Sequence, residues 1–378
     1  MTGSIAYIRA QEEPPKSYKN EDTTTARTEM SGSPMNASAT NPMADLYRRL
    51  RGVGLTKSYL RKFILPEWWD DEVAENPAGY AEGLSYLSRH LGLDLTTLRD
   101  STKPVAFRDF GACKFKKSAN VTEDQLALAR AMATRAAQLA DAAMVGSCQP
   151  LPRSGAQVRR EILGQGGRWV GLGNLVDYCW SLGIPVIHLS PCPTAKRPDG
   201  LAARVRGRPV IVLCKKDNLS AWLLFILAHE LGHIALGHLA GDGVLIDESM
   251  DRNIKDQEEI EANAFAVELL TGDAGCEFRT TGRWPNATRL AEAALEIGRQ
   301  SHVDPGHIVL NYAHTMGSGF WPVANAALGL LEPKRDALKV VRRQMAGRLD
   351  WSSLPEASSE FLMRISQAEH ASDLSVGQ

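Results

Sequence analysis

The pentapeptide His229-Glu230-Leu231-Gly232-His233 lies inside a long apolar stretch, and this context constrains the fold most strongly. The apolar residues 221–228 lead straight into it, and Ile234-Ala235-Leu236 follow. A helix that is apolar nearly all round is a buried helix. Buried histidine and glutamate side chains are costly without partners. We therefore predict a buried helix whose polar residues bind a common partner.

The spacing of these polar residues indicates a metal ion as that partner. His229 and His233 are four residues apart, so both imidazoles lie on one helix face and can reach one metal. Glu230 projects about 100° around the axis, where it can take a proton from a water molecule that the metal activates. This is the pattern of zinc hydrolases. The alternative, hydrogen-bonded core histidines, is less favoured in this apolar context.

A catalytic zinc site needs a third protein ligand, and the next predicted helix, residues 256–270, offers one. Glu259 and Asn263 are four residues apart and share a face. Glu259 can bind the metal, and Asn263 can hydrogen-bond a ligand histidine and fix its tautomer. Glu261 points elsewhere. The alternative for this acidic segment is a solvated helix start.

Other candidate residues have weaker support. Proteases with three histidine ligands place the third six residues after the second, but His238 follows His233 by five, so we interpret it as a helix-end residue. An electrophilic group for the oxyanion is expected. The candidates are Tyr312, His314 and His188.

Composition indicates a cytoplasmic globular protein. The chain has 378 residues, 44% of them hydrophobic, and a net charge of −1, which gives no overall bias toward nucleic acid or membranes. Its six cysteines form no Cys-x-x-Cys pair, which fits a reducing compartment. The first residues lack the apolar core of a signal peptide, and residues 221–228 are too few to span a bilayer.

The pattern along the chain predicts an α+β, mostly helical fold with a small three-stranded sheet packed on the motif helix. The strands are predicted at residues 185–189, 199–205 and 208–214. We predict four regions: a disordered tail (1–42), an N-terminal helical region (43–150), a zinc metallopeptidase core (151–275) and a C-terminal helical region (276–378). The tail is alternatively sequence upstream of a start at Met43.

The N-terminal helical region contains a basic stretch, residues 44–64, which we predict to be helical up to the stop at Pro66. Residues 84–98 faintly resemble the closing helices of a helix-turn-helix domain. Together these features suggest DNA contact. A helical domain with a solvated basic face is the favoured alternative, because charge runs carry little specificity.

The motif helix and residues 259–270 together resemble the ImmA/IrrE family of zinc metallopeptidases, and so do residues 182–186, 199–201 and 209–213 upstream. The resemblance covers about residues 173–272. It implies a small zincin fold with Glu259 as third ligand. It also implies cleavage of a helix-turn-helix repressor, which switches on stress or mobile-element genes. The chain departs from the family's Leu-Leu-Met-Pro at Thr271-Gly272, close to the expected substrate cleft.

The sequence therefore predicts a cytoplasmic zinc endopeptidase that cleaves a helix-turn-helix transcriptional repressor. Its Zn²⁺ ligands are His229, His233 and Glu259, and Glu230 is its general base. One alternative is a DNA-binding regulator or toxin–antitoxin component with a vestigial metal site, although the intact Glu230 argues against lost catalysis. Another is a zinc hydrolase that does not cleave proteins.

Overall fold

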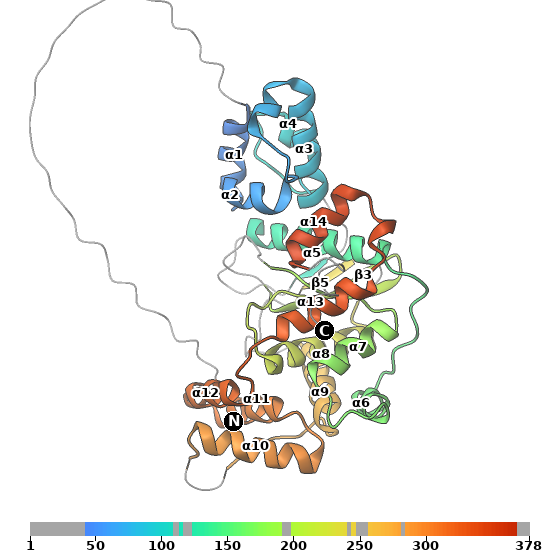
Figure 1. Cartoon of the computed structure of the whole chain (residues 1–378), viewed down its shortest axis with the longest axis vertical. Coiled ribbons are helices and arrows are strands. Elements are labelled where there is room, and N and C mark those ends of the chain that lie inside the picture. The colour runs from blue at the N-terminus through green and yellow to red at the C-terminus, as the bar shows by residue number, and fades with distance from the viewer. Residues whose placement is uncertain are drawn as a thin grey trace, which may run out of the picture.

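A computed structural model of the chain describes residues 42–108, 113–115, 123–190, 198–239, 243–246, 256–280 and 284–368. Residues 1–41 lie outside this part, so the disordered tail stays a prediction. Helices predominate among the described residues, and a sheet lies between them, which confirms the α+β, mostly helical fold class (Figure 1). Within the described ranges, no helix combines the length and apolar character that crossing a membrane requires.

The sheet is mixed and has five short strands in the order β1-β5-β3-β4-β2. The strands are β1 (Cys113–Phe115), β2 (Val186–His188), β3 (Gly200–Val205), β4 (Arg208–Leu213) and β5 (Gly243–Ile246). β2, β3 and β4 are the three predicted strands. β3 and β4 form an antiparallel hairpin whose loop residues, Arg206 and Gly207, both have positive φ (49° and 83°), as a two-residue type I′ turn requires. β1 and β5 extend this predicted sheet on the β3 side.

Helices cover the sheet on both sides. α5 (Glu123–Ala142) and α8 (Ser220–Leu236) each pack against β3 and β4, and Figure 1 shows the sheet between them. Residues Val210–Leu213 of β4 are fully buried, as expected for a strand covered on two faces. α9 (Gln257–Thr271) lies along α8, and α6 (Gly155–Gly164) and α7 (Leu172–Ser181) pack on this pair. The motif helix is therefore at the centre of the main core.

The N-terminal region is a group of short helices. They are α1 (Pro42–Gly52), α2 (Lys57–Tyr59), the π-helical turn η1 (Leu60–Ile64), the 3₁₀ turn η2 (Asp71–Glu75), α3 (Pro77–Leu91) and α4 (Leu95–Arg99). The continuous helix predicted for residues 44–64 is therefore wrong. Gly54 has a φ of 87°, and Thr56 caps a new helix by accepting a hydrogen bond from the Tyr59 amide. This break divides the basic stretch between α1 and the segment that follows it.

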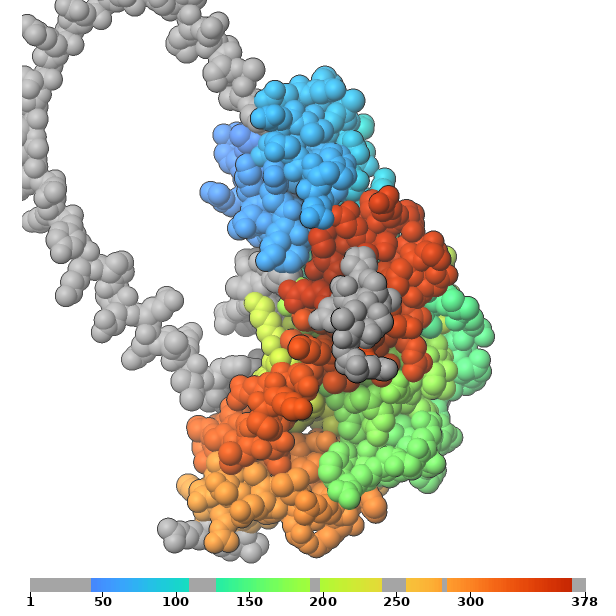
Figure 2. All heavy atoms as spheres, viewed as in Figure 1, coloured from blue at the N-terminus to red at the C-terminus, as the bar shows by residue number. Residues whose placement is uncertain are grey.

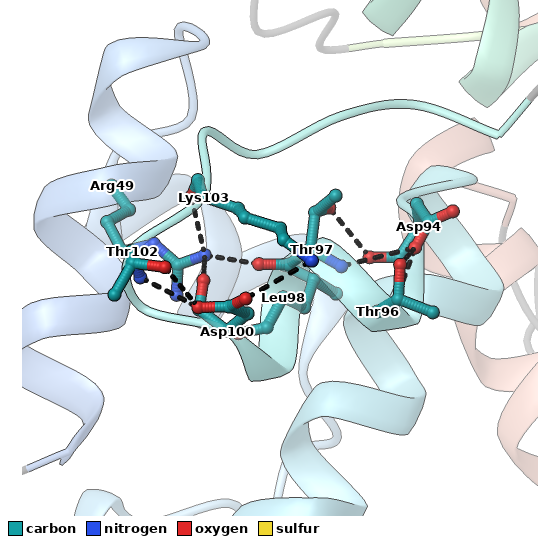
Figure 3. A network of polar contacts seen from close by, with 8 residues as sticks. All are labelled: Arg49, Asp94, Thr96, Thr97, Leu98, Asp100, Thr102 and Lys103. Carbon is teal, nitrogen blue, oxygen red and sulfur yellow. Dashed lines mark hydrogen bonds and ion pairs between the residues drawn. The ribbon is translucent and has the colours of Figure 1, made fainter.

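A polar network holds α1 against the end of α4 (Figure 3). The Arg49 guanidinium donates hydrogen bonds to four backbone carbonyl oxygens, those of Thr97, Leu98, Asp100 and Lys103. At the other end of α4, the Asp94 carboxylate caps the helix by accepting from the Thr96 and Thr97 amides. Arg49 therefore supplies the partners that the last carbonyl groups of α4 would otherwise lack.

Further basic side chains of the same stretch are paired within the region. Lys57 and Arg61 both contact the Asp71 carboxylate, at 2.6 and 3.0 Å. Arg48 pairs with Asp45 on its own helix. Arg48, Lys57 and Arg61 thus each pair with a carboxylate of the same region, although the Arg48 and Lys57 side chains remain exposed.

The C-terminal helices fall into two groups. α10 (Ala287–Ser301), α11 (Pro305–Met316), the 3₁₀ turn η3 (Ser318–Phe320) and α12 (Trp321–Leu331) form a separate apolar cluster around the start of α8. α13 (Ala337–Arg348), the 3₁₀ turn η4 (Trp351–Ser353) and α14 (Glu356–Ser366) return to the main core. α13 packs on α7 and β2, and α14 reaches α5 and η1, where the red C-terminal segment meets the blue N-terminal region in Figure 2. The four predicted region boundaries stay predictions.

Candidate metal centre

α8 begins and ends at residues that fix its position in the core. Leu219, the residue before the helix, has no side chain that can cap it. The Glu332 carboxylate at the end of α12 does so instead, because it accepts hydrogen bonds from the Ser220 amide and hydroxyl at 2.6 and 2.7 Å. The helix ends at Gly237, whose φ of 80° is the left-handed conformation that favours glycine. Between these ends, α8 holds the motif in the core.

α9 approaches α8 closely at a glycine of the motif. A Cβ atom on Gly232 would lie only 3.1 Å from the Ala262 carbonyl oxygen and from Phe265 Cδ1. The start of α9 is fixed by Asp256, whose carboxylate accepts a hydrogen bond from the Glu258 amide at 3.0 Å. This packing brings the first turn of α9, with Glu259, opposite the two histidines of α8.

Three buried side chains converge between the two helices. The Nε2 atoms of His229 and His233 are 3.0 Å apart, and the two Glu259 carboxylate oxygens each lie 3.3 Å from one of them. The three residues are at most 9% exposed. Tetrahedral zinc holds nitrogen and oxygen ligands at about 2.0–2.1 Å, which separates neighbouring ligand atoms by about 3.3 Å. The spacing and the donor set of this cluster therefore fit a zinc ion.

A hydrogen bond to His229 and the burial of His233 favour the protonation states in which these imidazoles bind a cation. His229 Nδ1 lies 3.0 Å from Asn263 Oδ1, the contact that the sequence predicts for Asn263. A carbonyl oxygen only accepts, so Nδ1 carries the proton and the Nε2 lone pair faces the cluster. Burial lowers the pKa of His233, which favours its neutral ring, the form that binds metals.

His238 contacts His233, a contact that the sequence analysis missed. The amides of Gly237 and His238 donate to the carbonyl oxygens of Ile234 and His233, at 3.2 and 3.0 Å. This Schellman arrangement folds the residue after the glycine back onto the last turn of the helix. The Nδ1 atoms of His238 and His233 are consequently 2.9 Å apart. In the sequence, a glycine followed by a histidine at the end of a predicted helix could have indicated this contact.

Glu261 faces this second histidine rather than the metal cluster. Its Oε2 lies 3.2 Å from His238 Nε2, and its Oε1 accepts from Gln257 Nε2 at 2.8 Å. Hydrogen bonds from Gln257 and His238 hold the pKa of Glu261 below its usual value, so its carboxylate is a hydrogen-bond acceptor. The expectation that Glu261 points away from the cluster agrees with this position.

Glu230 is buried, with 1% exposure, and its side chain lies against the first residue of β3. A Cβ atom on Gly200 would be 2.8 Å from Glu230 Oε1 and 2.5 Å from Ile226 Cγ2. Glycine at this position thus leaves the space that the Glu230 carboxylate occupies. The strand adjoining the motif helix sets where the predicted general base can lie.

The three candidates for oxyanion stabilisation occupy different places. Tyr312 belongs to the C-terminal apolar cluster, and its hydroxyl lies 3.3 Å from Thr280 Oγ1. His188 ends β2, and its Nε2 donates to the Lys215 carbonyl oxygen at 2.9 Å. His314 is exposed on α11. The role stays a prediction for all three.

A helix that supplies two imidazoles and a glutamate, with a second carboxylate from a following helix, has the site architecture of zinc-dependent hydrolases. Comparison with protein-family models gives a match at residues 179–293, to the peptidase family M78 model described as the IrrE N-terminal-like domain. The matched part of the chain contains all four site residues, and the match confirms the resemblance to ImmA/IrrE proteins. Searches of curated proteins and of solved structures found no match. The chain therefore carries a metallopeptidase-type domain.

Proposed function

We propose that this protein is a zinc-dependent endopeptidase. His229, His233 and Glu259 hold the zinc ion, and Glu230 acts as general base. The observation that carries this proposal is the convergence of two Nε2 atoms and a carboxylate, at distances of 3.0 and 3.3 Å, on a helix that also carries the buried Glu230. Two neutral ligands and one anionic ligand leave a net positive charge and an open position on zinc, as a catalytic site requires.

The chain's own residues supply the proton transfers. When bound, zinc lowers the pKa of a water molecule from about 15.7 to about 7 and polarises the scissile carbonyl group. The Glu230 carboxylate accepts the proton of the attacking water and then passes it to the leaving amine. The side chain lies against Gly200 of β3, which limits the space for the carboxylate on that side and favours a productive geometry.

The substrate that we propose is a helix-turn-helix transcriptional repressor in the cytoplasm, on the basis of the family resemblance. A zincin binds its substrate in extended form, so the cut falls in a loop or frayed segment rather than in a packed helix. The connector between a repressor's DNA-binding and dimerisation parts meets this need. Cleavage there releases operator DNA, because two half-sites need a dimer.

The charge distribution supports this proposal over direct DNA binding. The basic stretch of residues 44–64 uses Arg49 to hold α4, and pairs Lys57 and Arg61 with Asp71. A basic side chain that is paired with a carboxylate of its own chain contributes less to phosphate binding. The space that Gly200 leaves for Glu230 also argues against a vestigial site.

Mapping of new protein N-termini tests the proposed function. Zinc-loaded protein is incubated with a lysate of the cells that produce it, from resting and from stressed cultures. We expect one dominant cut in a repressor connector, abolished by a chelator and by Glu230→Gln, whose amide cannot accept the proton. Intact repressors would contradict the substrate. No new N-termini from any protein would contradict the peptidase and favour a zinc hydrolase with another substrate.

A further inference from the structure

A hydrogen-bonded chain runs from His233 to the protein surface. His233 Nδ1 lies 2.9 Å from His238 Nδ1, and His238 Nε2 lies 3.2 Å from Glu261 Oε2. The two histidine side chains are buried, whereas the Glu261 side chain is 44% exposed. The Schellman turn at Gly237 holds His238 in place through the backbone, since its amide donates to the His233 carbonyl oxygen at 3.0 Å.

The direction of each hydrogen bond in this chain follows from the chemistry of its outer end. A glutamate carboxylate only accepts, so His238 Nε2 donates to Glu261. When the His238 ring is neutral, it has one donor and one acceptor nitrogen, so its Nδ1 is then an acceptor. His233 Nδ1 must then donate to it, and the proton-free nitrogen of His233 is Nε2, the atom that faces His229 and Glu259.

We propose that His238 and Glu261 are positioning residues that fix the His233 tautomer, so that its Nε2 lone pair faces the metal. This inference rests on the proposed zinc site and assigns to His238 the role that Asn263 has for His229. Each ligand ring thereby has its own acceptor for the Nδ1 proton. Without His238, the proton of His233 can move to Nε2, where zinc must displace it before binding.

Zinc affinity of the full-length protein, measured by competition with a chromophoric chelator, tests the role of His238. His238→Leu removes the acceptor, and we expect zinc to bind about 10- to 100-fold more weakly, the usual effect of losing an outer-shell partner. His238→Asn places a carbonyl oxygen where Nδ1 was, and we expect it to restore most of the affinity. Wild-type affinity in His238→Leu, or equal loss in both variants, would overturn the proposal.

Glu261 has a matched control in Gln257, which contacts the same carboxylate from the preceding turn. We expect Glu261→Ala to weaken zinc binding about tenfold, the lower end of the range expected for His238→Leu. Gln257→Ala removes a hydrogen bond to Glu261 but leaves the bond from His238, so we expect wild-type affinity. An equal loss in the two variants would show that Glu261 does not act through His238.

The protonation of the rings gives a readout that does not depend on metal or activity. In metal-free protein, ¹⁵N NMR distinguishes imidazoles protonated at Nδ1 from those protonated at Nε2. We expect His233 protonated at Nδ1 in the wild type and a mixed population in His238→Leu. An unchanged tautomer would overturn the proposal. If the wild-type protein binds no zinc, the proposed zinc-dependent function is wrong, whatever the tautomer of His233.

Discussion

Replacing Gly200 with alanine tests whether β3 sets the position of the general base. In the structure, a Cβ atom on residue 200 would meet Glu230 Oε1 at 2.8 Å and Ile226 Cγ2 at 2.5 Å. Both distances are well below ordinary van der Waals contact. Either the Glu230 carboxylate or the strand must therefore move, while the metal ligands on α8 and α9 keep their own hydrogen bonds.

The size of the effect follows from the overlap. Ordinary contact begins at 3.4 Å and the Glu230 Oε1 distance is 2.8 Å, so a carboxylate that moves while the strand stays in place shifts by about 0.6 Å. A misplacement of about 1 Å costs on the order of 10²-fold in rate, so 0.6 Å corresponds to roughly tenfold. The clash with Ile226 adds an overpacking cost of about 1–3 kcal/mol in unfolding free energy.

The assay compares the cleavage rate of the substrate identified by N-terminal mapping with zinc affinity in the same preparations. We expect Gly200→Ala to lower kcat about tenfold and to leave zinc affinity unchanged. Gly164→Ala is the matched control, because nothing lies within 4 Å of its added Cβ atom. A folded, zinc-loaded Gly200→Ala protein with wild-type turnover would refute the proposed role of this strand. Parallel loss of zinc and activity would show that β3 supports the metal rather than the base.

Three further perturbations test other parts of the structure. Glu259→Ala is expected to weaken zinc binding more than Asn263→Ala, whose effect is roughly 10- to 100-fold; the reverse order in a chelator competition would exclude Glu259 as a ligand. Gly232→Ala, with a Cβ 3.1 Å from the facing helix, is expected to lower the unfolding free energy by about 1–3 kcal/mol in urea; an unchanged midpoint would contradict the close packing of α8 and α9. Burial lowers the pKa of His90 to about 3, where the ring stacks on Phe361. The unfolded chain binds a proton at this residue below a pH of about 6.5 and the folded chain does not, so stability falls as the pH falls, by about 2 kcal/mol between about pH 7 and 5. His90→Leu is expected to remove this part of the loss of unfolding free energy. If the unfolding free energies of wild type and variant fall in parallel with pH, His90 is not the cause.

Local periodicity predicted which side chains of the two helices share a face. The spacing of four residues between His229 and His233, and between Glu259 and Asn263, places each pair on one helix face regardless of the rest of the fold. Both pairs accordingly meet in the structure. The three predicted strands are rich in β-branched residues or flanked by clear turns, and they too are present.

Features that depend on contacts distant in the sequence could not be predicted in this way. The carboxylate that caps α8 comes from Glu332, 112 residues after Ser220. β1 has only three residues and is defined by its pairing with β5 rather than by its own pattern. The break at Gly54 was overlooked because the surrounding residues retain helical periodicity. The contact of His238 with His233 required recognising the turn at Gly237 as a Schellman motif.

The central claim is that α8 and α9 together form a zinc site, and metal content tests it most directly. Elemental analysis of the purified protein after dialysis is expected to give about one zinc per wild-type chain. We expect the same content in Glu230→Gln, which alters the base but no ligand, and little or none in His229→Ala and His233→Ala. Equal zinc content in the two histidine variants and the wild type would contradict the account.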